Sequence, residues 1–165
     1  MHFLDFSSDP LILTVSQDSP LGVRFSDFVT PFPAGINAAA SFNRGLIRTR
    51  GLLMGREHRG KGVNVALGPM MNMGRVAQGG RNWEGFGADP FLTGEAAYET
   101  ILGMQQAGVM ACAKHFVGKS VWFPASSIHM EFSNVGFVVN RKLTVPHTAQ
   151  TSMIGLYMTC MRIPF

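Results

Sequence analysis

Short apolar runs alternate with polar, glycine-rich stretches up to about residue 118. The runs contain β-branched or small apolar residues and end at turn-forming residues, a pattern typical of short buried strands. It predicts three such strands, at 10–16, 63–67 and 109–113. Apolar positions near helical spacing predict helices over 38–57 and 92–107. Glycine and proline predict loops over 21–37 and 68–90.

The ends of the second helix carry local signals. Thr93 is a candidate N-cap, with Glu95 just inside the helix, and Gly108 suits the position after its end. Gly45 and Gly51 lower the helix propensity of 38–57, but the apolar pattern there outweighs them.

The order of strand, loop and helix repeats, which favours an α/β fold with a parallel sheet. Polar residues follow the predicted strands: Asp18 the first, Arg81 the second, and Lys114 with His115 the third. In barrels and open α/β sheets alike, ligands bind beyond the carboxyl ends of the strands. The sequence therefore predicts a polar site at that edge.

This pattern stops after Gly118. Residues 119–165 contain one acidic residue, Glu131, and no helical stripe of two turns. The segment 135–140, VGFVVN, could form a strand, but no helical pattern follows it. We expect residues 119–165 to be an irregular, poorly ordered tail.

Composition narrows the function. The chain has 165 residues and a mass of 18.0 kDa, enough for one domain or part of a larger one. The net charge is +4 without a basic run, which argues against a nucleic-acid partner. No apolar run reaches the roughly 20 residues of a membrane span. The first ten residues carry Asp5 and Asp9 and lack the basic start of a signal peptide.

Other common sites lack their motifs. Cys112 and Cys160 stand outside any CxxC pair, so we expect both to pack as small apolar residues and predict no metal. No Gly-x-Ser-x-Gly elbow or complete phosphate loop occurs. Nothing in the sequence calls for a cofactor.

The polar candidates each have two interpretations. Asp18 could accept hydrogen bonds from a sugar diol, or it could cap a turn. Arg24 and Arg81 could donate to hydroxyls or carboxylates, or they could be solvated surface groups. Trp83 and Phe86 could form a wall against a sugar face, or they could pack in the interior.

Several segments together resemble glycoside hydrolase family 3, in the form of fungal secreted β-glucosidases. They are QDSPLGVR, FPAGINAAASF, GREHRGKGVNVALGP, GRNWEGFGADPFLTG and GVMACAKHFVG, within residues 16–118. The resemblance implies the first three βα units of a (β/α)8 TIM-type barrel over 16–118. Residues 1–15 would then be a divergent N-terminal segment, and 119–165 a tail outside the family.

The resemblance also implies roles. Asp18 would hold hydroxyls of the non-reducing glucose, Arg24 would border that pocket, Arg81 would bind the same sugar, and Lys114 with His115 would grip its hydroxyls. The implied substrate is a β-glucoside or cello-oligosaccharide. It would be hydrolysed at its terminal β-D-glucosyl residue with retention, outside the cell, during cellulose or β-glucan degradation, with no cofactor.

The chain departs from the family pattern in four ways. Ser19 stands where the family usually has glycine, and the loop MMNMGRVAQGG at 70–80 is unusual. The nucleophilic Asp of a Ser-Asp-Trp motif and the acid/base Glu are both missing, and the sequence changes abruptly after Gly118, as after a frameshift or intron read-through. We therefore expect a truncated fragment without turnover. The alternative is a non-catalytic carbohydrate-binding module.

Overall fold

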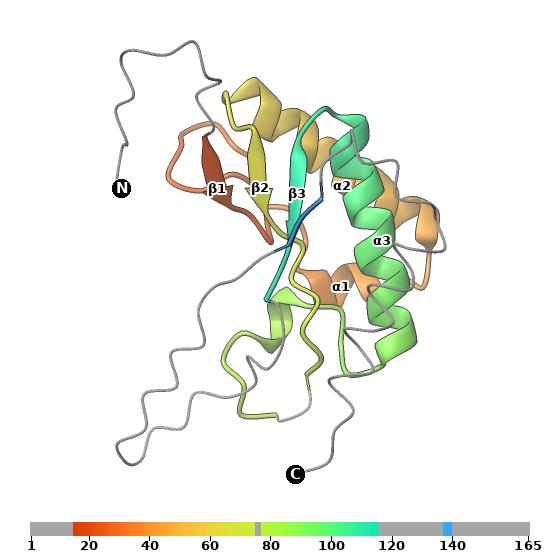
Figure 1. Ribbon diagram of the computed structural model, residues 1–165. Coiled ribbons are helices and arrows are strands. Elements are labelled where there is room, and N and C mark those ends of the chain that lie inside the picture. The colour runs from red at the N-terminus through yellow and green to blue at the C-terminus, as the bar shows by residue number, and fades with distance from the viewer. Residues whose placement is uncertain (1–14, 75–76, 116–136, 140–165) are drawn as a thin grey trace.

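The computed structural model describes residues 15–74, 77–115 and 137–139 (Figure 1). Its sheet has the order β1-β2-β3-β4. The first three strands are parallel, and β4 runs antiparallel to β3. Their bounds are Ser16–Asp18 (β1), Val65–Leu67 (β2), Met110–Ala113 (β3) and Phe137–Val139 (β4).

Helices connect the parallel strands. They are α1 (Gly35–Ala39), α2 (Arg44–Gly60) and α3 (Pro90–Gln106), with a short 3-10 turn, η1 (Asn82–Glu84), before α3. Figure 1 shows α2 and α3 side by side against the sheet. The predicted α/β fold with a parallel sheet is confirmed. Within the described ranges, no helix combines the length and apolar content needed to cross a bilayer.

The first strand lies later in the chain than its apolar run. Most of the predicted strand, residues 10–14, is outside the described residues, and β1 begins at Ser16. Pairing with β2 decides these bounds, because Ser16 lies opposite Val65 and Asp18 opposite Leu67. Asp18 is therefore the last residue of β1 instead of a turn residue after it.

The prediction of one helix over 38–57 is wrong, because α1 and α2 are separate helices. Phe42 between them has a φ of +49°, which no α-helix accommodates. The side-chain oxygen of Asn43 then accepts a hydrogen bond from the Leu46 N–H at 3.0 Å. Asn43 thus caps a new helix, and this local signal outweighs the continuous apolar pattern.

The start of α3 also differs from the prediction. Asp89 is the N-cap, accepting from the Leu92 N–H at 2.6 Å, and Pro90 opens the helix. The prediction of Thr93 as the cap is wrong, since Thr93 is buried inside the helix. Gly108 has a φ of +86°, which confirms it at the left-handed position after the helix.

Glycines allow α2 and α3 to pack closely. A Cβ atom on Gly51 would lie 2.5 Å from the Thr100 carbonyl oxygen, and one on Gly103 would lie 2.3 Å from the Arg48 carbonyl oxygen. Gly51 therefore lowers the helix propensity of α2, but it also lets α3 pack directly against the backbone of α2. The core formed by these helices and the sheet is rich in alanine and methionine, including Ala66, Ala97, Ala111, Met54 and Met104.

The segment 135–140 does contain a strand. Phe137, Val138 and Val139 pair with Ala113, Cys112 and Ala111 respectively. This antiparallel strand occupies the side of β3 that faces away from β2. The tail thus contributes to the sheet at 137–139, and its remaining residues lie outside the described ranges.

The helix contact generates a stability prediction. Gly51→Ala should lower the free energy of unfolding by about 1–3 kcal/mol, because the new methyl group forces α3 away from α2. Denaturant titration followed by circular dichroism measures this loss. Gly60→Ala is the matched control: it lies at the end of the same helix with nothing within 4 Å of its Cβ, and it should be neutral or slightly stabilising. Equal effects of both substitutions would contradict the close-contact argument.

Candidate functional site

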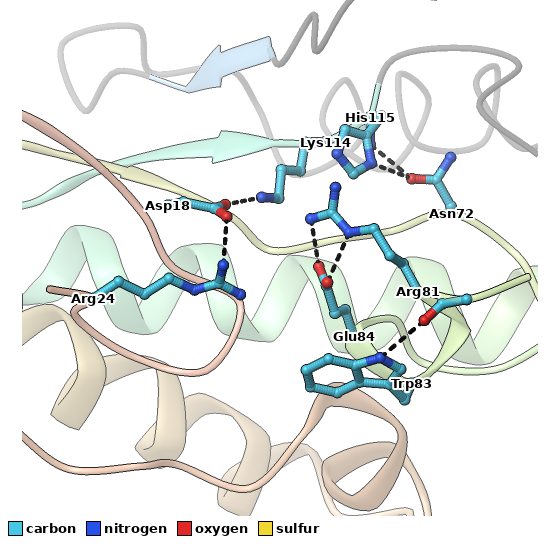
Figure 2. A network of polar contacts seen from close by, with 9 residues as sticks. Asp18, Arg24, Asn72, Arg81, Trp83, Glu84, Lys114 and His115 are labelled. Atoms are coloured by element: carbon cyan, nitrogen blue, oxygen red, sulfur yellow. Dashed lines mark hydrogen bonds and ion pairs between the residues drawn. The ribbon is translucent and has the colours of Figure 1, made fainter. Parts of the chain in front are cut away.

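The carboxylate of Asp18 forms two ion pairs at the end of β1. Its Oδ1 accepts a hydrogen bond from the Lys114 ammonium, and its Oδ2 lies 3.1 Å from Nη1 of Arg24. The Asp18 side chain therefore faces two cations. Figure 2 shows Asp18 between the two basic side chains.

Lys114 is held firmly by its backbone. Its N–H donates to the Pro69 carbonyl at 3.0 Å, and its own carbonyl accepts from the Met71 N–H at 2.7 Å. The parallel pairing therefore continues past the ends of β2 and β3, with Met70 bridged to Lys114. The Lys114 side chain is only 8% exposed. Its ammonium group pairs with Asp18 at the carboxyl ends of the strands.

Arg81 reaches the same region from the loop after β2. Its Nε and Nη2 donate to the two carboxylate oxygens of Glu84, at 2.7 and 2.8 Å. Both residues lie around η1, where a spacing of three places them on one helical turn. The bidentate pair uses two of the five guanidinium N–H groups and fixes the plane of the others. Arg81 is therefore an ion-paired residue instead of a freely solvated one.

Charge keeps Asp18 ionised. Burial alone would raise the pKa of this carboxyl group, but the hydrogen bond and charge of Lys114, with the charges of Arg24 and Arg81, outweigh it and lower the pKa. The Glu84 hydrogen bond raises the pKa of Arg81, against its partial burial. The cluster thus presents charged acceptors and charged donors together, which suits a neutral ligand rich in hydroxyl groups.

His115 follows Lys114 but is bound differently. Its ring is buried, and the Asn72 side-chain oxygen accepts from its backbone N–H at 2.8 Å and lies 2.9 Å from its Nδ1. A carboxamide oxygen is an acceptor, so Nδ1 carries the proton in this contact. The peptide bond between Lys114 and His115 is cis.

The two aromatic candidates behave differently. Phe86 is buried in the core, so the packing interpretation holds for it. Trp83 is 44% exposed, and its Nε1 donates to the Gly80 carbonyl at 3.1 Å. Its ring is therefore held in place beside Glu84 while part of it stays open to solvent (Figure 2).

Ser19 adopts an ordinary backbone conformation. Among the described residues other than glycine, positive φ angles occur at Phe25, Phe28 and Phe42, and Ser19 is not one of them. Its side chain is buried, against Gly68. The serine at this turn therefore carries no left-handed strain.

Sequence reasoning missed Glu84 and Asn72, the partners of Arg81 and His115. The Arg-x-x-Glu spacing was available as a signal for Glu84. Asn72 had no local signal, because a loop after β2 brings it to His115. Of the cysteines, Cys112 is buried as expected, and Cys160 is outside the described residues. In the described part of the chain, His, Cys, Asp and Glu form no group of three or more that could hold a metal.

Comparison with known proteins adds the family. The family model described as "Glycosyl hydrolase family 3 N terminal domain" matches residues 5–132. "Probable beta-glucosidase E" from Aspergillus fumigatus is 61% identical over 102 residues, which is 61% of this chain and 10% of that protein. The chain belongs to glycosyl hydrolase family 3.

Solved structures agree with this assignment. A family 3 β-glucosidase from Neurospora crassa has a TM-score of 0.63 and 55% identity, covering 64% of this chain and 13% of its own. β-Glucosidase 3B from Thermotoga neapolitana, in complex with α-D-glucose, has a TM-score of 0.60 and 39% identity, covering 64% of this chain and 16% of its own. The chain therefore matches only a small part of each relative's length.

The Asp18 ion pairs generate a pH prediction. Asp18→Asn should lower the free energy of unfolding at pH 7 by about 1–2 kcal/mol, because the nearly buried Lys114 loses its counter-charge while Asp18 itself is partly solvated. Since folding lowers the pKa of Asp18, its contribution is complete above the unfolded value of about 3.9 and is lost at lower pH.

Urea titrations of both proteins between neutral and acidic pH measure this. The difference between wild type and Asp18→Asn should narrow below about pH 4. Asp27→Asn, the same change at an exposed carboxylate, should stay within about 0.5 kcal/mol of wild type. A difference that stays constant with pH would contradict the ion-pair account.

Proposed function

We propose that this chain carries part of the subsite that holds the non-reducing glucose of a β-glucosidase. The observation that carries the proposal is the Asp18 carboxylate at the end of β1, flanked by Lys114 and Arg24. It lies at the carboxyl end of a parallel strand, the side of the sheet on which ligands bind in this class of fold. The three βα units would be the first units of a TIM-type barrel.

The chemistry of the cluster fits a sugar ring. A carboxylate can accept from two neighbouring hydroxyl groups, and the remaining N–H groups of Arg24, Arg81 and Lys114 can donate to ring hydroxyls. Such contacts raise the rate when they strengthen as the oxocarbenium-like transition state forms. His115 enters the proposal through its family motif, with its ring oriented by Asn72.

The relatives support this substrate class. The Aspergillus protein is named a β-glucosidase, and the Thermotoga enzyme was solved with glucose bound. For this chain we infer the same family chemistry, hydrolysis of terminal non-reducing β-D-glucosyl residues in cellulose or β-glucan degradation outside the cell. The exposed edge of Trp83 could then face the sugar.

We further propose that the 165-residue chain does not turn over substrate. A retaining glycosidase needs a nucleophilic carboxylate and an acid/base carboxyl group about 5–5.5 Å apart. The Asp18 and Glu84 carboxylates are each held by basic side chains, a state suited to binding. Residues 119–165 contain no Asp, and Glu131 has no family motif around it.

Binding can be tested with the fluorescence of Trp83. The second tryptophan, Trp122, is replaced by phenylalanine so that Trp83 alone reports. Titration with glucose or gluconolactone should give a Kd in the millimolar range, about −4 kcal/mol, as a partial subsite would. Asp18→Asn should abolish the response, and Asp27→Asn should leave it intact. A response that does not depend on Asp18 would overturn the proposal, and micromolar binding would favour the carbohydrate-binding module.

Turnover is tested separately with p-nitrophenyl β-D-glucoside. We expect the purified chain to release no p-nitrophenol above the buffer rate, because the catalytic carboxylate pair is missing. Asp18→Asn protein serves as the comparison, since it should match the wild-type trace. Release that is lost in Asp18→Asn would refute the absence of turnover.

A further inference from the structure

Arg24 belongs to a loop with a closed neck. We define the Arg24 loop as residues 20–33, between β1 and α1. At its base the Phe32 N–H donates to the Leu21 carbonyl at 3.0 Å. Gly22 has a φ of +123°, and a Cβ there would lie 2.8 Å from the Thr30 carbonyl oxygen. The two ends of the loop therefore lie together, and Arg24 emerges next to this neck.

A single buried side chain from α2 connects both ends of the loop. The Arg50 guanidinium donates through Nε to the Pro33 carbonyl at 2.9 Å and through Nη2 to the Pro20 carbonyl at 2.8 Å. Arg50 is only 7% exposed. Prolines 20 and 33 are the first and last residues of the Arg24 loop, so this one group spans its neck.

The burial of Arg50 is energetically costly. Desolvation lowers its pKa to about 10, which still leaves the side chain charged at neutral pH. The Pro20 and Pro33 carbonyl oxygens that accept from it offset the cost of burying a charge less than a carboxylate does. Only a planar fork can donate in two fixed directions at once, and a lysine ammonium lacks this geometry.

Glu57 of α2 and Lys61, the residue just after that helix, reach the same loop. Glu57 accepts from the Thr30 N–H and hydroxyl, both at 2.9 Å, and Lys61 donates to the Asp27 carbonyl at 2.7 Å. These contacts are exposed and hold the outer part of the loop, where solvent weakens them. Arg50 holds the neck, which is the part that fixes where Arg24 begins.

We propose that Arg50 is a positioning residue that clamps the neck of the Arg24 loop and so sets the Arg24–Asp18 ion pair in the sugar subsite. Arg50 acts through Arg24, because its own guanidinium is bound to the Pro20 and Pro33 carbonyls. The effect of Arg50 on sugar binding rests on the proposed function. Its effect on the Arg24 loop rests on the loop geometry alone.

A double-mutant cycle on the glucose Kd tests whether Arg50 acts through Arg24. Arg50→Lys should raise the Kd about three- to tenfold in the wild-type background. In the Arg24→Ala background the same substitution should change the Kd less than about twofold, because the group that it positions is gone. Arg48→Lys is the matched control: the same change on the same helix, at a residue paired with Glu99 of α3, should leave the Kd unchanged.

Equal effects in both backgrounds, or no effect of Arg50→Lys, would overturn the proposal. Hydrogen–deuterium exchange separates it from the proposed function. If the wild-type chain binds no glucose, the proposed function fails. Faster exchange of peptides covering 21–33 in Arg50→Lys than in wild type would still support the clamp. Unchanged exchange of these peptides would reject the clamp.

Circular dichroism first establishes that each variant folds. Should Arg50→Lys not fold, Arg50→Gln takes its place, since an amide can still donate to one of the two carbonyls. Failure of both variants to fold would assign Arg50 to stability alone and reject a positioning role.

Discussion

The backbone of Lys114 is hydrogen-bonded on both sides to the segment after β2, and its ammonium reaches the carboxylate at the end of β1. Three segments far apart in the sequence are thus fixed at one edge. The parallel register produces this arrangement, because it brings Asp18 opposite Leu67 and carries the pairing on to Met70 and Lys114. A shift of register would separate the two charges and leave a nearly buried ammonium without its counter-ion.

Helix packing supplies the second requirement. The glycines of α2 and α3 let the two helices approach each other closely where they lie against the sheet. The same helix α2 also presents Arg50 and Glu57 to the loop that carries Arg24, and Lys61 just after its end reaches that loop as well. Helix α2 therefore packs in the core with some of its side chains and holds the Arg24 loop with others.

The sequence was informative wherever the signal was local. Alternating apolar runs predict the α/β class, and family motifs single out Asp18, Arg24 and Lys114, which the structure brings into contact. Arg81 joins them through its charge, while His115 is turned into a contact with Asn72. The structure places these side chains; their roles toward a sugar remain proposals.

Other features could not be predicted because they depend on contacts between distant residues. The break between α1 and α2 depends on the positive φ angle of Phe42, which the sequence does not reveal. Asn43, by contrast, is a residue type that commonly caps helices and could have been recognised. Arg50 could not be distinguished from other helical arginines in the sequence. Its partners are main-chain carbonyls, which every residue has, so residue types give no signal for these contacts. The antiparallel direction of β4 likewise depends on tertiary pairing, which strand propensity does not encode.

The pairing of β4 with β3 has a consequence for association with other chains. A β-strand at the border of a sheet presents open main-chain groups that can recruit a foreign strand. In the order β1-β2-β3-β4, β3 is an inner strand paired with β2 on one side and β4 on the other, so among the described strands a newcomer could add only at β1 or at β4. The pairing of β4 therefore moves the border of the sheet one strand away from β3, the strand that leads into Lys114, and keeps a foreign strand from pairing with it.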